Sequence, residues 1–282
     1  MRLHRRLLSS VAVHALPGRG RSVVATAPIS AHTVVHESTP MARVLKRASA
    51  EQHCAECLDA CAGAAAPSGT QLCSSHCEDA YEARGGAMLE RVDLAPLHRL
   101  HEEDGRKFPL LIAELLVALL ADIKRTGRLP EAWAPLELCY AELHEEAQQH
   151  VEHEHAVLLD AFEAAGLANR QTLELFLPIA RYRRLLGAAQ LNAFELNLSH
   201  GAAVSALLPG LASCFNHSCE PNVLISCGAT SHVTFVAGED VPAGAELRIS
   251  YVDLDESREE RRKLLLHKYG FECDCARCAR GE

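Results

Sequence analysis

The sequence has no apolar run long enough to cross a membrane. Its longest apolar stretch, residues 110–121, spans 12 residues and contains Glu114, whereas a bilayer span needs about 18. A basic excess is also missing, because 28 Lys and Arg stand against 37 Asp and Glu, for a net charge of −9. General nucleic-acid-binding proteins usually carry the opposite sign. We therefore expect neither a membrane partner nor direct nucleic-acid binding.

We expect no secretory signal peptide, although the first ten residues, MRLHRRLLSS, are basic and free of acids. A transit peptide and an ordinary basic N-terminus both fit this composition, and the strand-like sequence from Val11 favours the second. With 282 residues and 12 cysteines, the chain is too long for a small disulfide scaffold. The cysteines therefore indicate a reducing compartment, the nucleus or the cytoplasm, with thiols that are free or bound to metal.

Short β-branched runs separated by glycine and proline lie on both sides of a helical middle. They occupy residues 9–47 and 204–252, whereas residues 88–191 carry leucines at helical spacing. Residues 256–268 are densely charged around three leucines, which predicts a short helix. We find no internal repeat and no low-complexity linker. The pattern predicts an α+β fold, with one β-rich domain that carries insertions.

Residues 137–163 hold eight acidic residues and neither lysine nor arginine. This segment therefore accounts for most of the net negative charge. It either keeps the chain soluble or faces a basic substrate such as a histone tail. Both interpretations stay open at this point.

Two cysteine pairs occur in a segment that is poor in large apolar residues. Cys54-x2-Cys57 is followed by Cys73-x3-Cys77. A pair spaced by two or three residues can place both thiolates on one ion, and two pairs complete the tetrahedral shell that zinc prefers. With four protein ligands such a site would be structural. Nearby Cys61, His53 and His76 are alternative candidates for one of the ligands.

A second cysteine cluster lies close to the end of the sequence, at Cys273-x-Cys275-x2-Cys278. Three thiolates leave one position of a tetrahedral zinc site unfilled. Cys219, within the segment NHSCEPN, is the best candidate for the fourth ligand. The sequence thus predicts two zinc ions per chain. The second ion would hold the tail against the β-rich domain.

Several motifs together resemble the SET-domain protein lysine methyltransferases. They are GRGRSVVA at 18–25, LNAF at 191–194, NHSCEPN at 216–222, GAELRISYVD at 244–253 and YGFECDCARC at 269–278. Their order resembles the subgroup in which a MYND zinc finger is inserted into the SET domain. The resemblance implies a β-rich, pseudoknotted SET domain of short sheets with a zinc-finger insert, a helical insert and a post-SET zinc tail.

The resemblance departs from that subgroup in two places. A full MYND finger has two interleaved zinc sites, but here the ligands of only the first are present, apart from Cys61. We also expect no C-terminal helical domain of the kind that longer members have. We therefore expect a reduced, one-zinc finger and a different selection of substrate. The implied organisation has SET residues at 9–47 and 191–255, a finger at 48–87, a helical insert at 88–190 and a post-SET tail at 256–282.

The resemblance implies that S-adenosylmethionine is the methyl donor. Gly18 and Gly20 suit a close approach of the backbone to this cofactor, because neither has a Cβ atom. The remaining expected cofactor contacts come from both halves of the SET domain: Arg19 through its backbone, Asn192 at the methionine end, Asn216 and His217 at the adenine and tail, and Tyr269 and Phe271, with Phe271 stacked on the adenine.

Tyr251 is the residue that we expect to act in catalysis, with Tyr269 lining the same lysine channel. A lysine amine has a pKa of about 10.4 and must lose its proton before it can attack. An apolar channel disfavours the charged amine. The hydroxyl of Tyr251 can then hold the neutral nitrogen in line with the methyl group, which is catalysis by positioning.

The implied function is methylation of lysine on a protein substrate, a histone tail or a non-histone protein, by a monomeric enzyme of the nucleus or cytoplasm. The alternative is a catalytically silent SET protein that acts as a zinc-dependent interaction module. Intact Tyr251, Asn192, Asn216 and His217 favour the enzyme.

Overall fold

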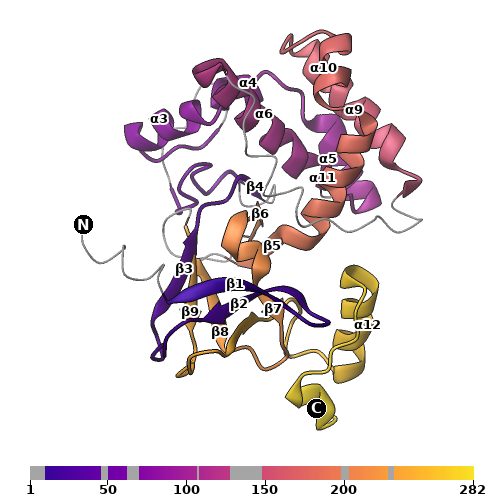
Figure 1. The fold of residues 1–282 in the computed structure, drawn as a ribbon. Helices are drawn as coiled ribbons and strands as arrows, with labels where there is room; N and C mark the ends of the chain where they lie inside the picture. The colour runs from indigo at the N-terminus through magenta and orange to yellow at the C-terminus, as the bar shows by residue number, and fades with distance from the viewer. Residues whose placement is uncertain are drawn as a thin grey trace. The chain divides into compact units, whose positions relative to one another are not determined.

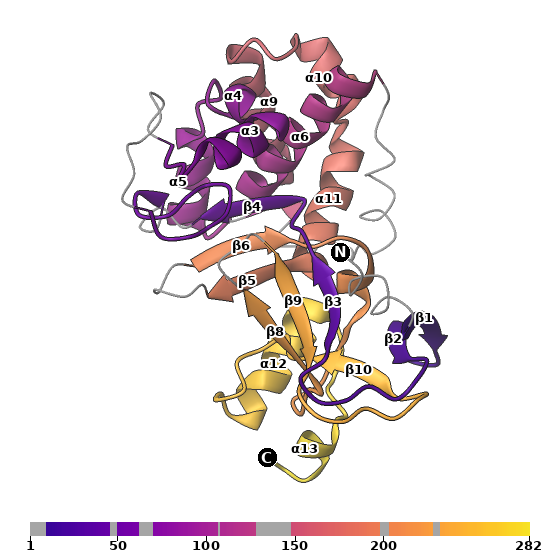
Figure 2. The ribbon, with the colours of Figure 1, turned by 90° about the vertical axis from the view of Figure 1, so that its left-hand side faces the viewer.

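The computed structural model describes residues 10–45, 50–61, 70–106, 108–127, 148–197, 203–227 and 232–282, drawn in Figures 1 and 2. The chain divides into two compact units. The first comprises Met1–Thr39, Pro209–Gly228 and His232–Glu282, and the second comprises Pro40–Leu208 and Ala229–Ser231. The basic segment 1–9 and the acidic residues at 137–147 lie outside the described residues.

The first unit is built on two small sheets. One has the order β1-β2-β10-β7, with β1 at Val11–Leu16, β2 at Gly20–Ala25, β10 at Glu246–Ile249 and β7 at Asn216–His217. The other has the order β3-β9-β8, formed by Val34–Ser38, Val233–Ala237 and Val223–Cys227; Figure 2 shows β9 between its two neighbours. Val23 on β2 and Val233 on β9 are buried, as the β-branched runs predict, whereas Val24 and Val236 are half-buried.

One parallel strand pair brings distant parts of the sequence together. β7 pairs with β10, so that Asn216 lies opposite Arg248 and His217 opposite Ile249. The main-chain N–H of Ser218 extends this ladder by donating to the carbonyl of Ile249 at 2.8 Å. The NHSC segment therefore runs beside the strand that leads into Tyr251. This pairing is what positions the candidate site.

The tail of the first unit contains helix α12, Arg258–Tyr269, and the short α13, Ala276–Ala279. Ser257 starts α12 with a capping box, in which its side chain and that of Glu260 each accept from the other residue's main-chain N–H. Gly270 ends the helix in the left-handed conformation, at a φ of 74°. The expected helix over 256–268 is thus present, displaced by one or two residues.

The second unit combines a sheet with a helical core. The sheet order is β4-β6-β5, formed by Ala42–Leu45, Ala203–Leu207 and Ala193–Asn197. The helices are α3 (Ser75–Ala83), α4 (Gly86–Leu89), α5 (Ala95–Asp104), α6 (Phe108–Thr126), α9 (Val151–Ala164), α10 (Arg170–Phe176) and α11 (Ile179–Asn192). Helix α6 supplies much of the buried cluster, including Leu111, Ile112 and Leu115, each at most 1% exposed.

Part of the acidic segment serves the core of this unit. Glu154 on α9 is 0% exposed. Its carboxylate accepts from Nε of Arg106 at 2.5 Å and from the hydroxyl of Tyr182 at 3.2 Å. A substrate-facing or solubilising role is therefore wrong for this residue, because burial and two partners commit it to the interior.

The helices of the described ranges include none with the length and apolar character of a membrane span. Helix α6 is the longest of them, at 19 residues, and its leucines pack within the second unit.

Candidate functional site

The glycines of the GRG motif form the turn between β1 and β2. The N–H of Arg19 closes the turn by donating to the carbonyl of Leu16 at 3.1 Å. Gly18 and Gly20 have φ values of 73° and 66°, which side-chain-bearing residues rarely adopt. A Cβ at either position would meet no atom of the chain within 4 Å. The left-handed backbone explains the glycines here, and the space beside them is open.

Asn216 ties this turn to the strand β7. Its Nδ2 donates to Oγ of Ser22 at 2.7 Å and to Oε1 of Glu246 at 2.8 Å. The same nitrogen lies 3.3 Å from the main-chain oxygens of Arg19 and Arg21. These contacts link the GRG turn to the NHSC segment, a connection that the sequence motifs alone did not indicate.

An ion pair joins the same turn to the cysteine-rich tail. Nη2 of Arg19 lies 2.8 Å from Oδ1 of Asp274, while Nη1 lies 3.9 Å from Oε2 of Glu246. Arg19 is 32% exposed and Asp274 79% exposed, so water screens the pair and its contribution to stability is small. The contact nevertheless shows that the turn and the tail are neighbours in the first unit.

His217 connects the tail cysteines with Tyr251. Its Nδ1 accepts the main-chain N–H of Tyr251 at 3.0 Å, so the ring proton resides on Nε2, which donates to Sγ of Cys219 at 3.3 Å. Burial, followed by the charges of Arg261 and Arg248, lowers the pKa of His217 to about 4. His217 is therefore neutral at physiological pH and holds a fixed tautomer.

Tyr251 directs its hydroxyl toward a backbone carbonyl. The hydroxyl donates to the main-chain oxygen of Phe215 at 2.6 Å. Burial, together with the neighbouring Tyr269, raises the pKa of Tyr251, so the phenol stays protonated. Because its single proton goes to Phe215, the oxygen lone pairs remain for accepting a hydrogen bond from another group. The carbonyl of Phe215 is a part of the site that sequence patterns could not reveal.

Four rings form one aromatic cluster around this hydroxyl. The ring centroids of Tyr251 and Tyr269 are 4.8 Å apart, and those of His217 and Tyr251 are 5.4 Å apart. Phe271 lies 6.1 Å from His217 and 6.5 Å from Tyr269. All are tilted pairs, a favoured arrangement for aromatic rings. The structure thus brings the expected catalytic and stacking residues of the first unit together.

Cys219 and the three tail cysteines form a buried cluster in the first unit. The sulfur of Cys219 lies 3.9 Å from that of Cys273 and 3.7 Å from that of Cys278. Together with Cys275, their sulfur atoms all lie within 4.8 Å of one another, and each residue is at most 6% exposed. Tyr251, Tyr269 and Phe271 pack against this cluster.

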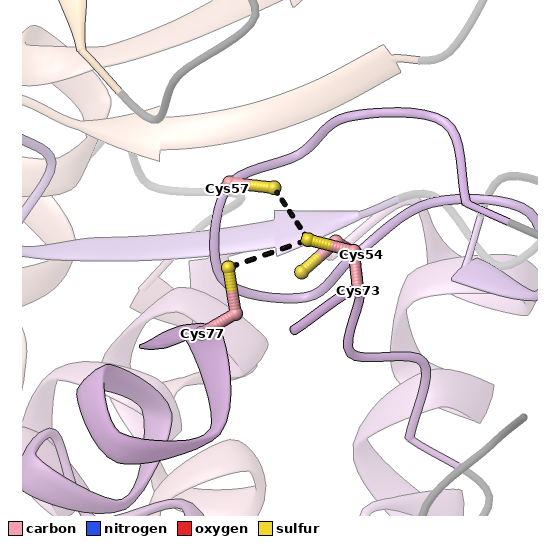
Figure 3. Close-up of side chains that lie close together, drawn as sticks. All are labelled: Cys54, Cys57, Cys73 and Cys77. Carbon is pink, nitrogen blue, oxygen red and sulfur yellow. Dashed lines mark hydrogen bonds between the residues drawn. The ribbon is translucent and has the colours of Figure 1, made fainter. Parts of the chain in front are cut away.

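The other predicted cluster lies in the second unit. Figure 3 shows the side chains of Cys54, Cys57, Cys73 and Cys77 pointing toward one another. The sulfur of Cys73 is 3.4 Å from those of both Cys57 and Cys77, and all four sulfurs lie within 4.8 Å. The structure gathers these four cysteines as one set, without the alternative candidates Cys61, His53 and His76.

Both sets of sulfur atoms fit a zinc ion. Four sulfurs bound tetrahedrally at about 2.3 Å lie about 3.8 Å from one another, close to the separations observed here. Burial alone would raise the pKa of Cys275, but main-chain N–H groups of Cys278 and Cys219, with hydrogen bonds from neighbouring thiols, lower it to about 6. One thiolate is thus available at neutral pH to receive an ion. Each cluster could hold one zinc ion through four cysteines.

A network of ion pairs connects the loop of Cys54 and Cys57 to the rest of the second unit. Oε2 of Glu56, between Cys54 and Cys57, lies 2.5 Å from Nη2 of Arg43 and 3.1 Å from Nε of Arg84. Arg84 also pairs with Glu114 of α6 at 3.0 Å. Burial would raise the pKa of Glu56, but the guanidinium groups of Arg43 and Arg84 outweigh it and lower the pKa.

We expect Glu56→Gln to lower the free energy of unfolding by about 2 kcal/mol, because it removes a charged hydrogen-bond acceptor from two arginines. The side chain of Arg43 is only 3% exposed, so water cannot replace the lost charge. Urea denaturation at neutral pH would measure the change. The matched control is Glu174→Gln, which removes an exposed partner of Arg170 and should change stability little. Equal effects of both substitutions would contradict the anchoring role of Glu56.

Asn192 is the one predicted cofactor residue outside the first unit. It ends α11 in the second unit, is 2% exposed, and its Nδ2 donates to the main-chain oxygen of Ala188 at 2.7 Å. Its expected contact with the methionine end of the cofactor stays a prediction. The other predicted cofactor and catalytic residues, Gly18, Arg19, Gly20, Asn216, His217, Tyr251, Tyr269 and Phe271, all lie in the first unit.

Curated proteins with similar sequences include two lysine methyltransferases. Histone-lysine N-methyltransferase ATXR4 of Arabidopsis thaliana is 26% identical over 279 residues, which cover 92% of this chain and 83% of that protein. Human histone-lysine N-methyltransferase SMYD3 is 47% identical over 87 residues. Those residues are 31% of this chain and only 20% of SMYD3.

One solved structure with a similar chain is the SET domain of LSMT bound to lysine and AdoHcy. It has 16% sequence identity and a TM-score of 0.48, and the similarity covers 94% of this chain and 53% of that one. The model of the SET domain family matches residues 20–252, which is most of the chain. The predicted SET fold is thereby confirmed: the chain belongs to the SET-domain family.

Proposed function

We propose that the chain is an S-adenosylmethionine-dependent protein-lysine N-methyltransferase of the nucleus or cytoplasm. The observation that carries the proposal is the convergence, within the first unit, of the GRG turn, Asn216, His217, Tyr251 and the tail aromatics. Homology to lysine methyltransferases supports it. The protein substrate would be a histone or a non-histone protein.

The cofactor would lie beside the GRG turn. S-adenosylmethionine supplies, when bound, a methyl group on a cationic sulfonium. The open space at Gly18 and Gly20 leaves their backbone accessible, and Asn216 fixes that turn to β7. Phe271 would cover the adenine, since its ring is half-buried next to His217.

The substrate lysine would enter among Tyr251, Tyr269 and the carbonyl of Phe215. An amine in an apolar channel is favoured in its neutral form, and the protonated phenol of Tyr251 is no base. The lysine therefore loses its proton to solvent before the reaction. The free lone pairs of the Tyr251 oxygen accept an N–H of the amine and orient the nitrogen. The bound donor would supply its methyl group to the lone pair of this nitrogen, sulfur would keep the electron pair of the broken S–C bond, and the methylated amine would release a proton.

Transfer of labelled methyl groups tests this proposal. We expect the purified protein, loaded with zinc, to move label from S-adenosylmethionine to proteins of a cell extract or to histones. Protein that binds the donor in a calorimeter but transfers no label to either substrate would instead be a silent SET module. Protein that binds no donor would be a zinc-dependent adaptor. Either result would overturn the proposal.

A further inference from the structure

Helix α12 buries an arginine where a hydrophobic residue would be expected. Arg261 is 1% exposed and is among the largest fully buried side chains of the described residues. Leu265, one turn later on the same face, is 0% exposed. A guanidinium does not lose its proton in proteins, and a buried charge is costly unless it has a partner of the opposite sign. The buried charge of Arg261 therefore requires a compensating group.

Each of the three nitrogens of Arg261 donates a hydrogen bond. Nε donates to Sγ of Cys219 at 3.4 Å. Nη1 donates to the main-chain oxygen of Glu256 at 2.5 Å, and Nη2 to that of Glu282 at 2.7 Å. Among the residues that the structure describes, no aspartate or glutamate side chain lies within ion-pair distance of this guanidinium. Its side-chain partners are thiols of the tail cluster, Cys219 first and Cys278 second.

The neighbouring residue on the helix shows the ordinary arrangement. Nη2 of Arg262 lies 2.7 Å from a carboxylate oxygen of Glu272, and both side chains are well exposed, at 34% and 66%. Arg262 therefore has a carboxylate partner at the surface, whereas Arg261 reaches the interior of the cysteine cluster. The two residues form a matched pair on one helix.

The charge of a metal-bound cluster accounts for this difference. Cysteines bind metal as thiolates, so four of them around one Zn²⁺ leave a net charge of about −2. The cluster is buried, and water cannot neutralise that charge. Cys219 receives two N–H groups from side chains, Nε of Arg261 and Nε2 of His217. Nδ1 of His217 accepts the main-chain N–H of Tyr251 and therefore carries no proton, so of these two side chains only Arg261 is positively charged.

We propose that Arg261 is the positioning residue that compensates the negative charge of the metal-bound Cys219–Cys273–Cys275–Cys278 cluster. Through its three contacts it also joins the NHSC segment, the residue before the capping box of α12 and the last residue of the sequence. The inference concerns metal binding by the tail cluster and does not depend on methyl transfer. It can therefore fail or succeed separately from the proposed function.

Zinc binding by the full chain tests this role. Wild type, Arg261→Met, Arg261→Lys and Arg262→Met are equilibrated with zinc against a series of competing chelators, and bound zinc is counted per chain. Cys275→Ser serves as the reference that lacks the tail ion. Far-UV circular dichroism and the zinc held by the other cluster report whether each variant is folded.

We expect Arg261→Met to keep one zinc ion tightly and to bind the second about 10- to 100-fold more weakly, the usual cost of losing a partner of a metal ligand. Arg261→Lys should show a smaller loss, because lysine keeps the charge but not the planar three-nitrogen geometry. Arg262→Met should bind both ions as wild type does. Equal zinc affinities for Arg261→Met and Arg262→Met would overturn the proposal. If Arg261→Met does not fold, Arg261→Lys against Arg262→Lys decides in the same way.

Discussion

Replacement of Tyr251 by phenylalanine is expected to lower kcat for methyl transfer at least about 100-fold, the scale of effect seen when a reacting group loses its position. The substitution removes one oxygen atom and keeps the ring against Tyr269 and His217. It therefore removes the acceptor for the lysine amine, and it also leaves the carbonyl of Phe215 without its donor. Rates measured with labelled donor at saturating substrate give the comparison.

Donor binding distinguishes the loss of the positioning hydroxyl of Tyr251 from a loss of the folded structure. Calorimetry should give the same affinity for S-adenosylmethionine in Tyr251→Phe and in wild type. Tyr182→Phe is the matched control, because it removes a buried hydroxyl bonded to Glu154 in the second unit and should retain transfer. Undiminished transfer by Tyr251→Phe would show that the hydroxyl has no part in the reaction.

Cys275→Ser is expected to remove one of two zinc ions and to lower the affinity for S-adenosylmethionine at least about 100-fold. A serine hydroxyl does not replace a thiolate ligand of zinc. The free energy of binding a structural zinc ion contributes to the stability of the folded tail. Without the ion, the packing of Tyr269 and Phe271 against the cluster is therefore lost. Elemental analysis and calorimetry on the same sample measure both effects.

Two further cysteine variants complete this experiment. Cys227→Ser alters a half-buried cysteine outside both clusters and should keep two zinc ions and full donor affinity. Cys73→Ser should lose the other ion and still bind the donor. Unchanged donor affinity in a Cys275→Ser protein that has lost its tail zinc would separate the metal from cofactor binding and contradict this account.

Short cysteine spacings predicted both clusters because local geometry limits where such side chains can reach. Cys54 and Cys57, or Cys275 and Cys278, are separated by so few residues that their sulfurs can share one ion. The longer connection, from Cys219 to the tail, was predicted from the missing fourth ligand. The structure places these eight cysteines in two sets of four, and their role as zinc ligands stays a prediction.

The charged residues and leucines of α12 did not predict which side chains form its buried face. Of three consecutive leucines, Leu265 is buried, whereas Leu264 and Leu266 are 37% and 50% exposed. The buried face is completed by Arg261, a residue type that sequence patterns place at the surface. A cysteine cluster formed by residues far along the chain decides this, and helical periodicity contains no information about it.

Glu154 and Asn192 also have surroundings that the sequence pattern did not predict. Glu154 belongs to an acidic run, but Arg106 and Tyr182 hold it inside the second unit. Asn192 fits a family motif, yet it lies in a different compact unit from the other cofactor residues. Motifs identify which residues matter, whereas the partners of a side chain depend on packing between segments that are distant in sequence.

The central claim is that this chain methylates lysine, and the mass spectrum of its product tests it most directly. The zinc-loaded protein is incubated with a cell extract and S-adenosylmethionine that carries a deuterated methyl group, and modified peptides are then sequenced. We predict deuterated methyl groups on lysine side chains, present with wild type and missing with Tyr251→Phe. Deuterated methyl groups on other residue types alone, or equal labelling by both proteins, would contradict the account.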